Sequence, residues 1–336
     1  MGQRIQVDTC PSSCPNGDRW YLFVLRGSRT GQALTRLVSI AWIVGLALLA
    51  GCGDARIEIT LDKPDPERLL RFWFGSYLGP AGGDPVAAGI LSVRGGRFRV
   101  DPDALDKWFP GGGDELRRRS RGGHVDSDDL ADFLQATYYD ARALPRTLAE
   151  FSTYQSWFRH DVHGPVTSAR RHIYIAEDAV REALSSYSDN GNRLIYSAGT
   201  AIVAEHHIGG DHVETTAMLR REDGFWDFMT YDADGNLAAR TLALPRSIES
   251  PTQCVGCHFG SKLFEPERSF PEAAPQGPDG QRMIHSMGNL RVVRFFDEHR
   301  KRSDTVLGLH ATLYVSELLK HPMSDDDRRL LEQLGL

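Results

Sequence analysis

The pentapeptide Cys254-Val255-Gly256-Cys257-His258 constrains this chain more than any other feature of its sequence. Two thiols separated by two residues and followed at once by a histidine form the C-x-x-C-H pattern that attaches haem c in exported proteins. The thiols add to the vinyl groups on one edge of the porphyrin, and the histidine is then placed to bind the iron. The motif predicts one covalent haem c, held by Cys254 and Cys257, with His258 as an axial ligand.

Two other uses of these thiols stay open. A structural zinc site needs two further ligands at matching spacing, and the later His285 and His299 are not so arranged. A thioredoxin-like redox dithiol requires a strand before the motif and a helix directly after it. We favour haem attachment over both.

Haem attachment requires export, and the N-terminal sequence predicts export. Arg36 precedes an apolar stretch that ends in small residues, is too short for a membrane-spanning helix, and is typical of a signal peptide. Its end, Leu49-Ala50-Gly51-Cys52, resembles a bacterial lipobox, whose cysteine carries the lipid of the mature protein. An ordinary signal peptide that ends near a cysteine is the alternative.

Lipid on Cys52 predicts a protein that is anchored to a membrane without spanning it. Gly53 follows the cysteine where an inner-membrane retention signal would place aspartate, so we expect the outer membrane and a domain that faces the periplasm. Residues 1–35 are an unusual preface to a signal peptide, and translation is expected to start downstream of Met1. Cys10 and Cys14 would leave with the leader, so no thiol remains for a disulfide.

Composition and loop-forming residues divide the chain into five expected segments. The net charge of −6, with both signs interspersed, argues against nucleic acid as a partner. The expected fold class is α+β, with a β-rich haem domain between helical regions. The segments are a leader with signal peptide (1–52), a tether (53–63), a mainly helical region (64–148), a β-rich haem c domain (149–270), and a linker with C-terminal helices (271–336).

Two helix starts are predicted in the segment 64–148. Pro64-Asp65-Pro66-Glu67 opens a helix that continues through Phe74. The run 122–130 resembles the second half of an EF-hand loop, but the first half lacks the acidic ligands that calcium needs. A helix with Ser127 as its N-cap and two aspartates in its first turn explains the same residues without calcium.

From about residue 150 the sequence changes to the alternation of β-strands. Arg171–Ile175 predicts a short strand, followed by a helix over 177–187. Turns rich in glycine and aspartate then separate further expected strands, which cover 199–205, 212–221, 225–231 and 237–244. The pattern predicts an antiparallel meander that leads into the haem motif, with Trp226 and Phe228 in its core.

This succession of motifs resembles a known family. In order, it comprises Arg171–Ile175, a helix, Gly199–Glu205, Thr216–Arg220, Trp226-Asp-Phe228, Asp234-Gly235 and C-x-x-C-H. It is similar to the cytochrome P-460 and cytochrome c-prime-beta family, which are small β-rich haem c proteins with the haem motif near the C-terminal end of the domain. The resemblance covers about residues 150–270.

The resemblance implies roles for individual positions. His258 matches the family's proximal histidine, and Arg171 matches its distal-pocket arginine, for which a surface position is the alternative. The lysine that cross-links to the haem in hydroxylamine-oxidising members falls at Ala204, which has no amine. The distal carboxylate falls at Thr216, and Glu214 lies on the same face of the strand. These departures argue against hydroxylamine oxidation.

The C-terminal segment bears on the sixth iron ligand. A linker is expected over 271–280, an amphipathic helix over 306–319, and a final helix capped by Ser324. Met283 and Met287 follow His258, and either could supply a thioether to the iron. Such a six-coordinate iron transfers electrons, whereas an iron with an open distal site binds small molecules.

We therefore expect an exported, membrane-anchored monohaem cytochrome c with an open distal site. Its expected ligand is a diatomic gas or a small nitrogen compound, and its expected protein partner is a periplasmic redox protein. A six-coordinate electron carrier is the first alternative. A lipoprotein without haem, in which Cys254 and Cys257 form a redox dithiol, is the second.

Overall fold

The computed structural model describes residues 56–62, 65–151, 154–163, 169–242, 248–252, 254–255, 292 and 308–336. Within these ranges the chain forms seven α-helices and two sheets, which confirms the α+β class. The predicted site residues that lie outside the described ranges are Cys52, Cys257, His258, Met283 and Met287.

The N-terminal region contains four helices, namely α2 (Pro66–Gly75), α3 (Pro102–Trp108), α4 (Gly112–Arg119) and α5 (Ser127–Ala141). It also contains a sheet of order β2-β3-β1-β4 that the sequence analysis did not anticipate. Its strands are β1 (Ile57–Ile59), β2 (Leu91–Arg94), β3 (Arg97–Val100) and β4 (His124–Val125). β1 lies in the segment predicted as a tether, because its two isoleucines are buried against this region.

The first turn of α5 corrects one predicted cap. The helix begins at Ser127, but its N-cap is Asp126, not Ser127. The carboxylate of Asp126 accepts hydrogen bonds from the backbone N–H groups of Asp128 and Asp129, at 3.0 and 2.9 Å. An aspartate serves as well as a serine at this position, and its negative charge also favours the N-terminal end of the helix dipole.

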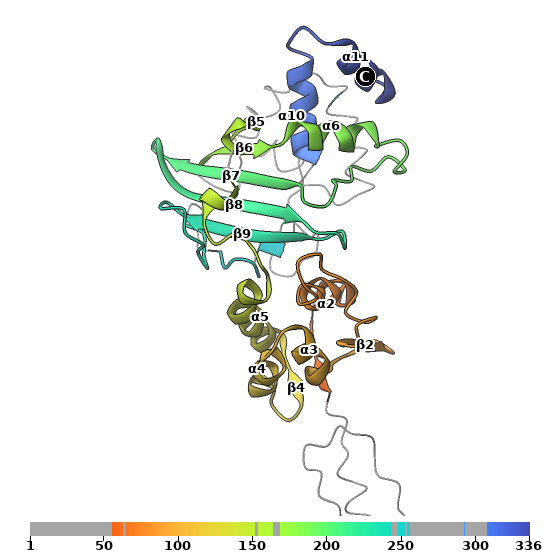
Figure 1. The fold of residues 1–336 in the computed structure, drawn as a ribbon, viewed down its shortest axis with the longest axis vertical. Helices are drawn as coiled ribbons and strands as arrows, with labels where there is room; N and C mark the ends of the chain where they lie inside the picture. The colour runs from red at the N-terminus through yellow and green to blue at the C-terminus, as the bar shows by residue number, and fades with distance from the viewer. Residues whose placement is uncertain are drawn as a thin grey trace, which may run out of the picture. The chain divides into compact units, whose positions relative to one another are not determined.

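The second sheet has five antiparallel strands in sequence order, which lie side by side in Figure 1. They are β5 (Phe158–His163), β6 (Arg170–Ile175), β7 (Ala201–Ile208), β8 (Asp211–Arg220) and β9 (Trp226–Asp232), with α6 (Glu177–Ser185) between β6 and β7. β5 was not predicted. Trp226 and Phe228 are buried, as predicted.

The predicted strand over 237–244 is wrong for its described part. After β9 the chain turns at Asp232–Asn236 and stays beside β9 only briefly, where the N–H of Ala238 donates to the carbonyl of Thr230 at 2.7 Å. It then leaves the sheet edge, because the N–H of Leu242 donates to the carboxylate of Glu214 on β8. A side chain thus takes the donor that a strand would use in a ladder.

The C-terminal helices α10 (Gly308–Leu318) and α11 (Asp325–Gln333) contact α6. Arg181 of α6 donates to the hydroxyl of Tyr314 at 2.8 Å and to Asp327 at 2.7 Å. Ser324 caps α11 as predicted, in a reciprocal arrangement with Asp327.

The register of the second sheet sorts its side chains onto two faces. Arg171 lies opposite His206, which lies opposite Glu214, and Ala204 lies opposite Thr216. Cross-strand partners and residues two apart share a face, so these five side chains form what we call the Arg171 face. The other side, with His172, Tyr174, Glu205 and His207, is the His172 face.

Candidate functional site

The four predicted distal residues, Arg171, Ala204, Glu214 and Thr216, all belong to the Arg171 face. They come from three adjacent strands, β6, β7 and β8. The structure therefore brings together residues that the sequence separates by up to 45 positions, as the numbering shows. What they have in common is a place on one side of the sheet.

Arg171 is half-buried, and its Nε is inaccessible to solvent. Within the described residues this Nε has no hydrogen-bond partner. Burial lowers the pKa of the guanidinium, although an arginine stays charged at any physiological pH. The side chain is thus a cation that faces the interior of the fold, which favours the pocket position over the surface alternative.

Glu214 is almost fully buried, with 1% of its surface exposed. Its Oε2 accepts a hydrogen bond from the backbone N–H of Leu242. Its Oε1 lies 3.9 Å from Nδ1 of His206. The carboxylate therefore joins the chain after β9 to the centre of the Arg171 face.

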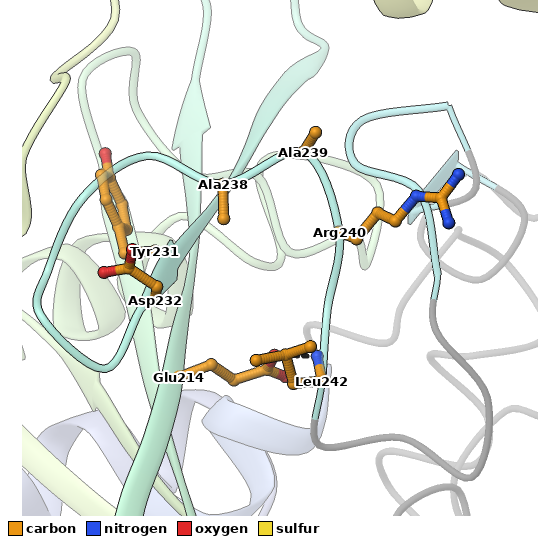
Figure 2. A pocket seen from close by; sticks show the side chains of 7 residues that line it. All are labelled: Glu214, Tyr231, Asp232, Ala238, Ala239, Arg240 and Leu242. Carbon is orange, nitrogen blue, oxygen red and sulfur yellow. Dashed lines mark hydrogen bonds between the residues drawn. The ribbon is translucent and has the colours of Figure 1, made fainter.

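A cavity of about 300 Å³ opens beside Glu214. Figure 2 shows Glu214 and Leu242 together at one end, whereas the guanidinium of Arg240 points away from Glu214. The remaining lining residues are Tyr231, Asp232, Ala238 and Ala239. Cavities of this size hold small molecules.

His206 completes the site and was missed by the sequence analysis. It is buried, and its Nε2 lies 3.2 Å from the hydroxyl of Thr216. Burial, with a contribution from the charge of Arg171, lowers the pKa of His206 to about 3. The imidazole is therefore neutral near pH 7. Its spacing of two residues from Ala204 could have identified it, because strand residues two apart share a face.

Ala204 and Thr216 are the small residues of the face. Both are half-buried and lie directly opposite each other on β7 and β8. The sequence has no lysine between Lys107 and Lys262, so no strand of this sheet carries an amine. The hydroxyl of Thr216 bonds His206 in the place where the resembling family has a carboxylate.

Helix α5 holds the segment that leads into the haem motif. The amide of Gln135 donates to the carbonyl of Ser250 at 2.8 Å and accepts from the hydroxyl of Thr252 at 3.2 Å. The hydroxyl of Tyr139 lies 2.7 Å from that of Ser250. Ser250 and Thr252 are buried. The N-terminal region thereby fixes the position of the backbone two residues before Cys254.

Cys254 is half-buried at the end of this anchored segment. Its Sγ lies 3.8 Å from Oγ of Ser250, and its backbone N–H donates to the carbonyl of Pro251 at 3.1 Å.

Comparisons with known proteins do not assign the chain. No family model matches the sequence, and no curated protein matches it. Among the described residues, no helix is long and apolar enough to cross a membrane.

Proposed function

We propose that this chain is an exported, lipid-anchored monohaem cytochrome c of the cytochrome P-460 and cytochrome c-prime-beta type. Cys254 and Cys257 would hold the haem, and His258 would bind its iron. The Arg171 face would form the distal side and bind a diatomic gas or a small nitrogen compound. Lipid on Cys52 would keep the protein on the periplasmic side of the outer membrane, within reach of a redox partner.

The observation that carries the proposal is that Arg171, whose Nε is buried, has no carboxylate partner among the described residues. A buried charge is normally paired, because burial without a partner is strongly unfavourable. Among the described residues no group bonds its Nε, and the nearest titratable neighbour in register, His206, is neutral. A polar or anionic ligand on this face would supply the missing acceptor.

The described residues fit a covalent haem. Helix α5 fixes the backbone that precedes Cys254, whose sulfur would form one of the two thioether bonds. The Arg171 face carries polar side chains at Arg171 and Glu214. On β7, the strand between theirs, it carries the small side chain of Ala204. When bound, haem c supplies an iron whose open position takes small ligands.

The residues of the Arg171 face would divide the remaining work. Arg171 would donate a charge-assisted hydrogen bond to the ligand. His206 would hold no proton on one ring nitrogen and could accept a hydrogen bond from a protonated ligand. Its bond with Thr216 orients the ring. Without a lysine on the sheet, no side chain could form the cross-link of hydroxylamine-oxidising members.

Acid-acetone extraction tests haem attachment. The full chain, expressed with the haem c maturation machinery, should retain its haem through extraction, because thioether bonds survive acid. Cys257→Ala should sharply reduce the retained haem, whereas Cys52→Ala should leave it unchanged and release the protein from the membrane fraction. Haem that extracts freely from the wild-type chain would refute the proposal in favour of the lipoprotein without haem.

Carbon monoxide and azide test the distal side. The reduced protein should bind carbon monoxide readily, and the oxidised protein should bind azide. Arg171→Leu should weaken azide binding about 10- to 100-fold, the value of one hydrogen bond between charged groups. Arg170→Leu is the matched control, since Arg170 is on the same strand but on the His172 face, where it pairs with Asp161 at 2.7 Å. Resistance to carbon monoxide that Met283→Ala or Met287→Ala relieves would instead establish the electron carrier.

A further inference from the structure

The His172 face carries a second cluster of potential ligands, which the proposed haem site does not use. One nitrogen of His172, one oxygen of Glu205 and one nitrogen of His207 all lie within 4.8 Å of one another. His172 is on β6, and the other two are on β7. All three side chains are 15–18% exposed, so an ion could enter from solvent.

The distances suit a single small cation. Oε2 of Glu205 lies 3.7 Å from Nδ1 of His172 and 3.5 Å from Nε2 of His207. Ligands about 2.1 Å from a tetrahedral zinc ion are about 3.4 Å apart, by simple geometry from the usual bond lengths. Only small side-chain movements would bring the three atoms to that separation.

One of these three atoms, Nε2 of His207, makes no hydrogen bond among the described residues that would compete with a cation. Nε2 of His207 is buried and makes no hydrogen bond within the described residues, although it points toward Glu205. The ring of His207 lies 4.5 Å from that of His172, centroid to centroid, at an angle of 36°. Buried ring nitrogens normally have a partner. A shared cation would provide one for both rings.

Neighbouring hydroxyl groups hold the carboxylate in place, as hydrogen-bond donors around metal ligands commonly do. The hydroxyl of Tyr154 donates to Oε1 of Glu205 at 2.7 Å, and that of Tyr174 donates to Oε2 at 2.9 Å. Each oxygen accepts one of these hydrogen bonds and keeps a lone pair for a cation.

A further carboxylate lies near His172. With Nδ1 toward Glu205, its Nε2 lies 3.8 Å from Oδ1 of Asp161. This separation is longer than a hydrogen bond. A small rotation of the ring would let Nε2–H donate to Asp161 and hold Nδ1 toward the cation, as carboxylates do for metal-binding histidines.

We infer that His172, Glu205 and His207 form a binding site for one zinc ion. Two imidazoles and one carboxylate are a ligand set that zinc uses, whereas calcium and magnesium require mostly oxygen ligands. Three protein ligands leave one coordination position, which water would fill. The site lies on the opposite face of the sheet from Arg171 and does not depend on the haem proposal.

Zinc binding by the full chain tests the inference. Isothermal titration with Zn²⁺ and metal analysis after dialysis should give one ion per chain. The same result is expected in a Cys254→Ala/Cys257→Ala background, which removes the thiols as competing ligands. His172→Ala or His207→Ala should weaken binding at least about 100-fold, and Tyr174→Phe about 10-fold. Zinc should also raise the melting temperature of the wild-type chain.

His321→Ala is the matched control, because His321 is an exposed histidine beside a carboxylate, Glu317, outside the cluster. It should bind zinc like the wild-type chain. If the alanine variants fail to fold, Glu205→Gln keeps the side-chain shape and should still lose the affinity. Absence of zinc binding in the Cys254→Ala/Cys257→Ala background, or binding that survives Glu205→Gln and both histidine variants, would overturn the inference.

Discussion

Two parts of this molecule bury arginines in opposite ways. Where α2 and α5 meet the end of the second sheet, Arg142 and Arg221 are fully enclosed, with 2% and 0% of their side chains exposed, and each has carboxylate partners. On the Arg171 face, Arg171 has no carboxylate partner among the described residues, and its buried Nε, like that of Arg142, makes no hydrogen bond there. Paired charges of the first kind serve the architecture, whereas a charge of the second kind is what a binding site requires.

The junction network centres on Asp227, which is fully buried. Arg142 contacts one of its oxygens at 2.5 Å, and the hydroxyl of Tyr138 donates to the other at 2.5 Å. Arg142 also donates to the carbonyl of Ser76 at 3.1 Å. The network therefore ties the end of α5 to the residue after α2 and to β9, and it satisfies most of the polar groups that it buries.

The second junction arginine is held by a carboxylate and by aromatic rings. Arg221 pairs with Asp223 at 2.7 Å and lies 3.6 Å from Asp227. Its guanidinium also stands over the ring of Phe72 at 4.9 Å from the centroid. Cation–π contacts of this kind add to the stabilisation of a buried arginine. Nothing comparable surrounds Arg171 in the part of the chain that the structure describes.

Asp227→Ala should have the largest effect on stability among variants of these two regions. It would leave Arg142 without its carboxylate and deprive Arg221 of a second one, so we expect the free energy of unfolding to fall by about 3–5 kcal/mol. Urea denaturation followed by circular dichroism measures the change. Asp234→Ala, at an exposed position in the turn after β9, should change stability by less than about 0.5 kcal/mol. Equal effects of the two variants would contradict the structural role of the network.

The second-largest expected effect is a loss of stability at low pH, caused by protonation of His206. The pKa of this residue in the folded chain is about 3, against an ordinary value of 6.5, so the unfolded chain binds the proton first. Its contribution to stability is therefore complete above about pH 6.5 and is lost as the pH falls toward 3. The slope is about 1.4 kcal/mol per pH unit for one proton. Chemical denaturation between pH 6.5 and 5 should reveal this slope.

His206→Leu should remove that part of the slope, since leucine cannot titrate. The interval from pH 6.5 to 5 is chosen because surface carboxylates remain ionised there. His124→Leu, at an exposed position on β4, should keep the wild-type slope. A wild-type slope in His206→Leu would mean that another group carries the acid sensitivity.

Local sequence signals predicted much of this fold. Alternating side chains and glycine-rich turns were sufficient for β6, β7, β8 and β9, and Ser324 was a recognisable cap, because each signal lies within a few residues of what it specifies. The β1–β4 sheet was not predictable in the same way. Its strands have two to four residues, and β1 pairs with β4 across most of the N-terminal region.

The sequence predicted most residues of the candidate site but not the contacts between them. The resemblance nominated Arg171 and Thr216, and the two-residue period of a strand added Glu214. His206 lies between Arg171 and Glu214 only because of the register of three strands. The hydrogen bonds between α5 and residues 250–252 could not be predicted either, because Gln135 and Ser250 are 115 positions apart in the sequence. Pairings over such separations depend on tertiary packing, which a single sequence does not display.

Arg171→Leu should produce the smallest change in stability. It should be stabilising, whereas variants of the network around Asp227 should be destabilising. If Arg171 is kept for a ligand, removing its charge eliminates an unfavourable burial, and the ligand-free chain should gain about 0–2 kcal/mol. Arg142→Leu makes the same replacement at an almost fully buried arginine, but it should be destabilising by several kcal/mol because it leaves the buried carboxylate of Asp227 without this partner. The two variants, measured side by side in urea, thus compare a binding arginine with a structural one. A loss in Arg171→Leu as large as that in Arg142→Leu would mean that Arg171 also belongs to the architecture, whatever the chain binds.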